Sequence, residues 1–393
     1  MAKPKTTIGI DLGTHSVKAV QVSNFGNGLK VERAALVRLH TDGTNEDRRS
    51  EELVRALRTV ATVFHVKKAT IITALPGQDT FIRYLRFPKM PPEELKNSIE
   101  LEADQNLPYD LTEVSTDSVV LEEITERNET IMKILLVAAK NEMINKTLDL
   151  LRSVGLATSI LGITTLAIAD AFEANSGFQP DETVALINIG ASSTNIHFCR
   201  DGVSNFTRDI SRGGRDLTSA IQKMLKVTYD EAERLKTDYA RKNFGKANGE
   251  SAGFDDVETV ESDDLSLDVG AGGEATDEPT EPMKSVKMDD GSRIVNATRP
   301  ALNRLIGEIR RSIDYYEKQL YEKNVGRLVL SGGTAMFPGL DQSLADATGV
   351  PVEIVDPVQS LIVEEGAPGI KDLIENRAQF NVAVGLAARG FAE

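Results

Sequence analysis

The sequence predicts an α/β protein built from two similar halves, and two matching segments are the main reason. Residues 8–21 and residues 185–198 each read as an apolar strand, a glycine turn and a second strand with alternating polarity. The first strand of each segment ends in an acid or its amide, Asp11 in one copy and Asn188 in the other. A strand, a tight turn and a strand form a hairpin. Because each hairpin opens its own series of strands and helices, we interpret the pair as a duplicated domain.

The tips of these hairpins have the chemistry of a phosphate site. Unpaired backbone N–H groups and hydroxyls attract anionic oxygens, and glycine lets the backbone approach a ligand. Lys18 would neutralise phosphate charge, and Asp11 would hold a hydrated Mg²⁺. Either motif alone has a simpler alternative, an ordinary surface turn with a solvated lysine. The candidate residues are Asp11, Gly13, Thr14, His15, Ser16 and Lys18 in the first hairpin, and Asn188, Gly190, Ala191, Ser192 and Ser193 in the second.

Two further glycine pairs extend this candidate nucleotide site. One pair precedes a helix of about residues 216–225, and the helix after that carries an acid and a lysine one turn apart that could bracket a ribose. Taken alone, these two residues are more simply an i,i+3 ion pair. The other pair follows a strand and precedes a helix, an arrangement that lets a planar base lie against the backbone. The residues are Gly213, Gly214, Glu233 and Lys236, then Ser331, Gly332, Gly333 and Thr334.

Composition narrows the classes of function. The chain has 393 residues and a net charge of −15, and this negative charge argues against a nucleic-acid partner. Cys199 is the one cysteine in the sequence, which excludes an internal disulfide. Neither a Walker A motif nor a GxGxxG after a strand is present, so P-loop and Rossmann sites have little support. No signal peptide or membrane-spanning run is visible, which predicts a cytoplasmic protein without direct membrane insertion. Residues 243–290 hold 14 acids against 3 lysines and are predicted to be disordered, or else a solvated surface loop.

Hydrophobic periodicity and turn residues place the other elements. Three strands are expected within 6–40, one at 69–75 and three within 183–210, with a type I′ turn at Asp201-Gly202. Residues 80–140 read as a small α/β unit, a strand, a helix and two strands. We therefore predict one half over 1–175, which includes this unit, and a second over 176–393, which includes the acidic stretch. The expected helices are 51–64, 164–174, 216–225, 229–241, 296–322, one from about 339, and 380–391.

The ordered set of features resembles the actin-like ATPase superfamily. The set comprises the two hairpins, the helix near 164–174, the Gly213-Gly214 turn with its following helices, and LVLSGGTAMFPGL with the later helix FNVAVGLAARG. Three segments narrow the resemblance: FIRYLRFPKMPPEELKNSIELEADQNLPYDL, FTRDISRGGRDLTSAI, and SIDYY at 312–316. These are similar to the PilM family, the cytoplasmic actin-like proteins of type IV pilus machines.

This resemblance implies both a fold and a role. The fold would be actin-like, with duplicated α/β halves around a nucleotide cleft and a small inserted subdomain placed as in FtsA. ATP with Mg²⁺ would occupy the cleft. A groove between the large N-terminal subdomain and the small one would take the cytoplasmic N-terminal tail of PilN as an extended peptide. The protein would be a scaffold peripheral to the inner membrane, forming a ring with other pilus membrane and motor components in twitching motility.

The chain departs from the superfamily pattern at two acids. The superfamily usually has an acid at the position of Asn188 and often another near 162–164, where this chain has none; Asp170 follows one to two turns later. Without them, little remains to orient or deprotonate an attacking water, so we predict ATP binding with slow hydrolysis and assign no catalytic residue. Two alternatives stay open, an active ATPase or kinase and an FtsA-like division protein. The last 14 residues contain one arginine and no membrane-binding face, which favours the pilus reading over the division protein.

Overall fold

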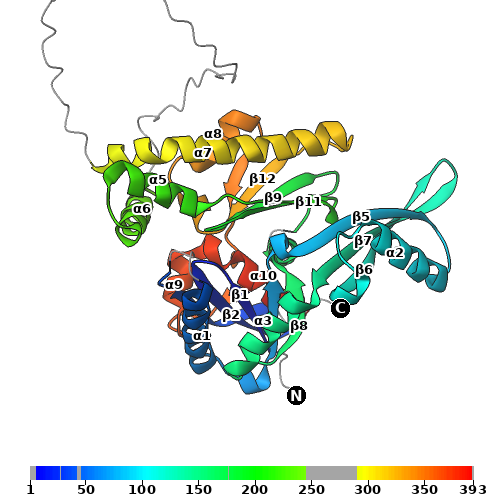
Figure 1. Ribbon diagram of the computed structural model, residues 1–393, viewed down its shortest axis with the longest axis horizontal. Helices are drawn as coiled ribbons and strands as arrows, with labels where there is room; N and C mark the ends of the chain where they lie inside the picture. Colours follow the sequence, from blue (N-terminus) through cyan, green and yellow to red (C-terminus); the bar gives the residue numbers. More distant parts are fainter. Residues whose placement is uncertain (1–5, 27, 42–45, 176, 245–289, 392–393) are drawn as a thin grey trace, which may run out of the picture.

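The computed structural model describes residues 6–26, 28–41, 46–175, 177–244 and 290–391, and within them the chain is α/β, as predicted. Its described strands form two large sheets and one small sheet (Figure 1). The strand order is β14-β3-β2-β1-β4-β8 in the first large sheet, β11-β10-β9-β12-β13 in the second and β5-β7-β6 in the small one.

The first large sheet begins with the first predicted hairpin. Three antiparallel strands are followed by two parallel ones, and a short strand from the C-terminal part joins the outer edge. Leu53, Leu57 and Val60 of the first helix are buried against the sheet, as their spacing predicts, although that helix begins at Glu46 and not at residue 51. The elements are β1 (Thr6–Leu12), β2 (Ser16–Asn24), β3 (Leu29–Arg38), α1 (Glu46–Val63), β4 (Thr70–Leu75), α3 (Asn141–Ser153), β8 (Thr158–Ile163) and β14 (Ile362–Val363).

The second large sheet repeats this plan. Its β11-β10-β9-β12-β13 order matches β3-β2-β1-β4-β8 strand for strand, with the same antiparallel and parallel pairings, so the structure contains the duplication that the two hairpins predict. Asp201 and Gly202 both have positive φ, 54° and 79°, as a type I′ turn requires. The strands are β9 (Thr183–Ile189), β10 (Thr194–Arg200), β11 (Val203–Ile210), β12 (Arg327–Ser331) and β13 (Val352–Ile354).

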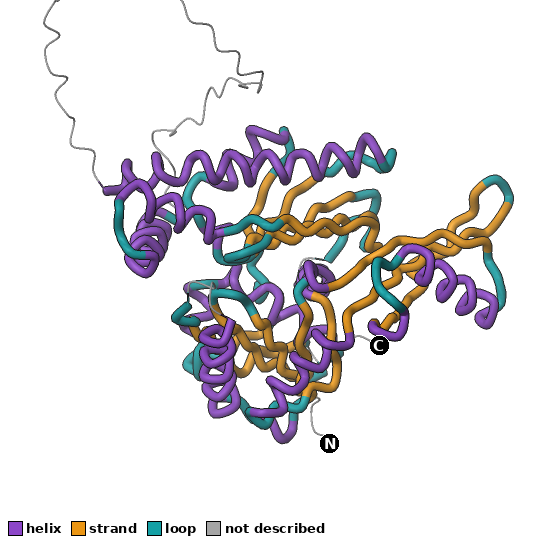
Figure 2. The backbone as a smooth tube through the Cα atoms, viewed as in Figure 1, coloured by secondary structure: helices purple, strands orange, loops and turns teal. Residues whose placement is uncertain are grey.

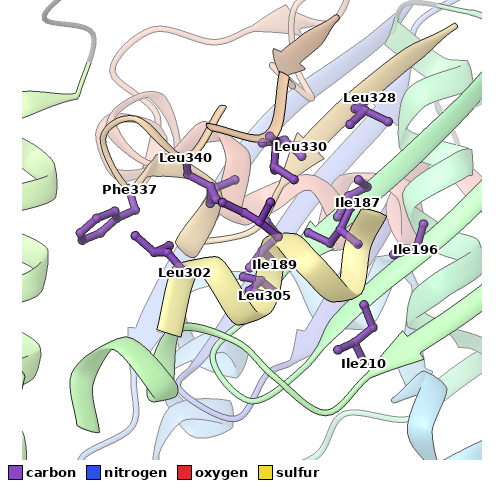
Figure 3. Close-up of a cluster of buried hydrophobic side chains, with 14 of the residues drawn as sticks. Ile187, Ile189, Ile196, Ile210, Leu302, Leu305, Leu328, Leu330, Phe337 and Leu340 are labelled. Carbon is purple, nitrogen blue, oxygen red and sulfur yellow. The ribbon is translucent and has the colours of Figure 1, made fainter. Parts of the chain in front are cut away.

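Helices on one face of the second sheet close its core. Leu302 and Leu305 of the long helix pack with Ile187 and Ile189 of β9, and Leu340 completes the contact (Figure 3). Because β9 lies in mid-sheet, its inward residues are fully buried and hold the second hairpin in place. The helices are α5 (Gly214–Leu225), α6 (Tyr229–Asn243), α7 (Asp290–Asp314) and α8 (Leu340–Thr348).

The long helix differs from its predicted bounds of 296–322. It begins at Asp290, ends as an α-helix at Asp314 and continues as one π-helical turn, Tyr315–Gln319. Tyr316 of that turn is fully buried, and its ring stacks on Phe198 with 4.4 Å between centroids. The wider turn accommodates this stacking while Tyr315 contacts another strand aromatic, so tertiary packing, not helix propensity, ends the α-helix. Ser312, Ile313 and Tyr316 of the SIDYY segment are thus part of the core.

The small subdomain projects to one side of the two large sheets (Figure 1), and Figure 2 shows its strands as a separate sheet. Ile99 and Ala103 of its helix and Leu107 just after the helix pack against Ile134 and Leu136 of the sheet. Strands β5 and β6 contact β11 of the second sheet. The elements are β5 (Thr80–Pro88), α2 (Pro92–Asn106), β6 (Val114–Glu126) and β7 (Glu129–Lys140).

Two crossing helices lie between the large sheets. They are α4 (Thr164–Asn175) and α10 (Asn381–Arg389), and α9 (Ile370–Glu375) packs beside β3. The elements α9, α10 and β14 return to the first sheet although they follow residue 176. The predicted boundary between the two halves at 175/176 stays a prediction. The predicted disorder of 243–290 lies outside the described residues except at its ends. No helix among the described residues is long and apolar enough to cross a membrane.

Candidate functional site

The two hairpin tips face each other across a cleft between the large sheets. The hydroxyl of Thr14 in the first tip lies 2.6 Å from the hydroxyl of Ser192 in the second. The cleft is also lined by the start of α5, by α6 and by the loop after β12. All the predicted site residues line it except Gly213 and Ser331, so five segments far apart in the sequence meet at one place.

The two hairpins carry equivalent pairs of polar side chains. In the first, Asp11 lies opposite Lys18 in the strand register, and Lys18 Nζ donates to Asp11 Oδ2 at 2.9 Å. In the second, Asn188 lies opposite Asn195, and their side-chain amides are joined at 3.1 Å. The duplication therefore places a charged pair on one side of the cleft and a neutral pair on the other.

Glycines hold the second tip in position. Gly214 N donates to Gly190 O at 2.9 Å, and a Cβ at Gly213 would lie 2.6 Å from the same oxygen. Gly332 has φ +87°, and a Cβ there would meet Ile189 O at 2.5 Å. Gly213 and Gly332 therefore allow two chain segments to pass directly behind the hairpin.

Two residues of the loop after β12 contact the second hairpin as well. Thr334 Oγ1 donates to Gly190 O at 3.0 Å, and buried Ser331 lies 3.5 Å from Asn188 Oδ1.

Glu233 and Lys236 are an ion pair, with 2.7 Å between Nζ and Oε2, and both line the cleft. Lys236 Nζ also donates to Thr218 Oγ1 at 2.8 Å and to Gly214 O at 3.1 Å. Burial lowers the pKa of Lys236. Burial raises the pKa of Glu233, but the nearby Lys236 and His15 and the hydrogen bonds from Lys236 and Thr218 together outweigh burial, so the net shift is downward. The pair is therefore a fixed polar group on the wall of the cleft that α6 provides.

His15 reaches across the cleft from the first hairpin. Its Nε2 lies 3.7 Å from Glu233 Oε1. Burial lowers the pKa of His15 to about 4, with Lys236 and Lys18 acting in the same direction and Glu233 opposing them. The imidazole is therefore neutral at pH 7.

The donors in the cleft fit a nucleotide-borne Mg²⁺ and do not fit a protein-held metal centre. No group of three or more His, Cys, Asp or Glu side chains among the described residues could hold a metal ion. Asp11 supplies one carboxylate and Asn188 one amide oxygen near the hairpin tips. Mg²⁺ keeps most of its waters and binds through one or two carboxylates together with substrate phosphates. Asp11 would hold such an ion through water.

Sequence reasoning missed several residues of the cleft. Asn195 could have been found, because it occupies the place of Lys18 in the repeat. The other missed residues come from separate elements and share no sequence motif. Among them, Leu217, Ala240 and Phe337 add apolar surface that suits a nucleotide base. The missed residues are Leu12, Leu36, Arg38, Pro76, Gly77, Thr164, Asn195, Leu217, Thr237, Ala240, Phe337 and Gln379.

Two acids lie near residues 162–164, where the superfamily often has an acid and this chain has none. Asp170 faces away from the cleft lining and pairs with Arg389 at 3.4 Å, and burial raises its pKa to about 6. Asp209 of β11, inside the FTRDISRGG segment, accepts hydrogen bonds from Asn195 and Thr165. The sequence reasoning did not single it out, because strand register alone brings Asp209 beside Asn195.

Duplicated sheets around a polar cleft define an actin-like ATPase fold. Similarity to a solved structure of ethanolamine utilization protein EutJ from Carboxydothermus hydrogenoformans supports this fold, with a TM-score of 0.50 and 15% identity over 98% of this chain and 90% of that one. The profile of the family described as type IV pilus assembly protein PilM matches residues 9–245 and 292–391. The chain belongs to this PilM family.

Two further similarities were found, one to a PilM complex and one to a cell division protein. The structure is similar to a solved PilM-PilN type IV pilus biogenesis complex, with a TM-score of 0.75 and 25% identity over 98% of this chain and 99% of that one. The sequence is also 24% identical to the cell division protein FtsA of Staphylococcus epidermidis over 387 residues, which cover 90% of this chain and 74% of that protein.

Proposed function

We propose that this protein is a nucleotide-binding scaffold of the type IV pilus inner-membrane platform. The observation that carries the proposal is the cleft between two duplicated hairpins, whose tips carry hydroxyls, backbone N–H groups and Lys18. ATP with Mg²⁺ would place its phosphates between the tips and its ribose near Glu233 and Lys236. Membership of the PilM family supports the pilus role.

We expect slow hydrolysis, because the second side of the cleft is neutral. Asn188 stands where an acid would deprotonate water, its partner Asn195 is also an amide, and an amide does not take a proton from water at pH 7. Asp209 lies behind Asn195 and outside the cleft lining. Steady turnover well above background that Asn188→Ala abolishes would contradict this expectation.

The proposed partner is the cytoplasmic tail of PilN. The similar solved structure is a PilM-PilN complex. In this chain β8 ends the first large sheet, and β5 and β6 end the small one, so main-chain edges border the region between these sheets. An extended tail would add to such an edge through backbone hydrogen bonds. Binding would place the protein at the inner membrane, in a ring with other pilus components, and ATP would alter it only through a difference in affinity between cleft states.

An FtsA-like division role is the second candidate, because the likeness to FtsA covers 90% of the chain. The PilM family profile favours the pilus role.

Calorimetric titration with a peptide of the PilN cytoplasmic tail, with and without Mg-ATP, tests the proposal. Lys18→Ala should weaken ATP binding, because it removes a cation from the cleft. Lys30→Ala is the matched control on the neighbouring strand, since Lys30 pairs with Glu364 at the surface.

Peptide binding at micromolar or tighter affinity would support the scaffold, and its change with ATP would measure the coupling free energy. Absence of peptide binding in both states, with measurable ATP turnover, would favour an enzyme instead.

A further inference from the structure

Asp209 receives two hydrogen bonds on one carboxylate oxygen. Asn195 Nδ2 and Thr165 Oγ1 both donate to Oδ1, the second at 3.2 Å. The other oxygen faces Gly77, where a Cβ would lie only 2.4 Å away. Burial raises the pKa of Asp209, and the two donated hydrogen bonds oppose this shift. The carboxyl group is therefore enclosed by three segments, β10, α4 and the turn before β5.

Two series of hydrogen bonds start at Asp209, and we call each an arm. The first arm runs into the cleft, and which group donates and which accepts at each step follows by elimination. A carboxylate only accepts, so Asn195 must turn its NH₂ group toward Asp209. The carbonyl oxygen of Asn195 is then left to accept from Asn188 Nδ2, at 3.1 Å. Asn188 must then turn its own oxygen, Oδ1, toward buried Ser331, whose Oγ lies 3.5 Å away outside the cleft lining, and toward Gly332, which lines the cleft together with Asn188.

The other arm runs from Asp209 to the small subdomain. His197 is fully buried, and burial lowers its pKa to about 4, so it is neutral. Its Nδ1 lies 3.0 Å from Thr165 O and must donate, which leaves Nε2 to accept from Ser204 Oγ at 2.7 Å. Tyr84 of β5 then donates to Ser204, at 2.8 Å. Every donor on both arms points toward Asp209.

We propose that Asp209 is a positioning residue that makes Asn188 present a hydrogen-bond acceptor to the cleft. An acceptor at this place receives hydrogen bonds from the waters of a nucleotide-bound Mg²⁺ and repels the oxygens of a bare triphosphate. Asn188 thereby performs one task of the missing acid, contact with metal-bound water, without a negative charge to deprotonate a water. This inference rests on the proposed nucleotide function.

The test compares two affinities of the full-length protein for ATP, one in excess Mg²⁺ and one in EDTA. Their ratio measures the preference for the metal complex. Asp209→Leu keeps the branching and the number of side-chain heavy atoms, although it is bulkier, and it removes the acceptor. The amides then lose their fixed polarity, and the ratio should fall about tenfold. Asp209→Asn retains an acceptor oxygen and should keep the ratio within about twofold of the natural protein. Ser204→Ala breaks the other arm, outside the cleft, and should leave the ratio unchanged.

Each outcome bears on the inference. A ratio that Asp209→Leu leaves unchanged, or that Ser204→Ala lowers equally, overturns it while the proposed function stands. If the natural protein binds no ATP in either condition, the proposed function fails and the inference fails with it. If Asp209→Leu does not unfold cooperatively, Asn195→Val breaks the same arm one link nearer the cleft, and an unchanged ratio in that variant overturns the inference.

Discussion

Single buried charges in this protein have measurable effects that local sequence does not reveal. Asp170 lies on α4 beside α10, and its contact with Arg389 at 3.4 Å only partly offsets its burial. The pKa of about 6 in the folded protein exceeds the ordinary value of 3.8, so the folded state binds the proton more tightly than the unfolded state. The free energy of unfolding should therefore fall as pH rises from about 4 to about 6.

We predict that Asp170→Asn is more stable than the natural protein at pH 7, by on the order of 1–3 kcal/mol, because it removes a poorly solvated charge. The difference should vanish below about pH 4, where the carboxyl group is protonated in both states. Urea unfolding at the two pH values measures it, and Glu365→Gln is the control, because Glu365 is exposed and is not among the charges that shift the pKa of Asp170. A variant less stable than the natural protein at pH 7 would refute the prediction.

At the scale of elements, the contact between α4 and α10 depends on glycine. A Cβ at Gly385 of α10 would lie 1.9 Å from Ala167 O of α4. On the other side of α10, a Cβ at Gly9 of β1 would lie 2.0 Å from Ala383 O. The helix is thus held between a strand and a helix at backbone distance, where the two halves of the molecule meet.

We predict that Gly385→Ala destabilises the protein by about 3 kcal/mol or more, because the backbone of α4 or α10 must shift to admit the methyl group. Gly307→Ala in α7 is the matched control, since its nearest neighbour would be 3.6 Å away and alanine favours a helix by up to about 1 kcal/mol. Thermal unfolding of both variants decides the matter. Equal melting temperatures would contradict the prediction, because they would show that the contact between α4 and α10 admits a methyl group without loss of stability.

At the scale of the whole molecule, the cleft is closed by contacts between its two sides. Thr14 touches Ser192 at 2.6 Å, and His15 lies 3.7 Å from Glu233. In the proposed function the phosphates occupy the space between the tips, so the halves must separate before nucleotide binds. The closed arrangement and the nucleotide then compete, and ATP would shift the population toward a more open cleft.

A disulfide between the tips tests this competition. In the double variant Thr14→Cys, Ser192→Cys, oxidation should join the hairpins and weaken ATP binding about tenfold or more, because the open state is no longer populated. Reduction should restore the affinity. The natural Cys199 is buried and burial raises its pKa, so it does not interfere. Unaltered ATP affinity in the crosslinked protein would mean that nucleotide does not pass between the tips.

Much of the fold was predictable because its signals are local. The period-2 strands, the turn at Asp201 and the helical face of Leu53, Leu57 and Val60 each depend on neighbours within a few residues. The elements α3, β8, α9 and β14 were not predicted. The last two are short, six and two residues, and the edge strand β8 has no clear alternation of burial, so periodicity is weak in all three.

The sequence by itself determined the duplicated hairpins, the glycines that let segments approach them and the membership of a family, because each is written in a continuous run of residues. Only the tertiary structure decided which acid lies beside the amides of the cleft. Asp209 meets Asn195 through strand register and Thr165 through the packing of α4, at separations of 14 and 44 residues. Hydrogen bonds across such separations depend on how sheets and helices pack, and no local pattern of residue types specifies that packing.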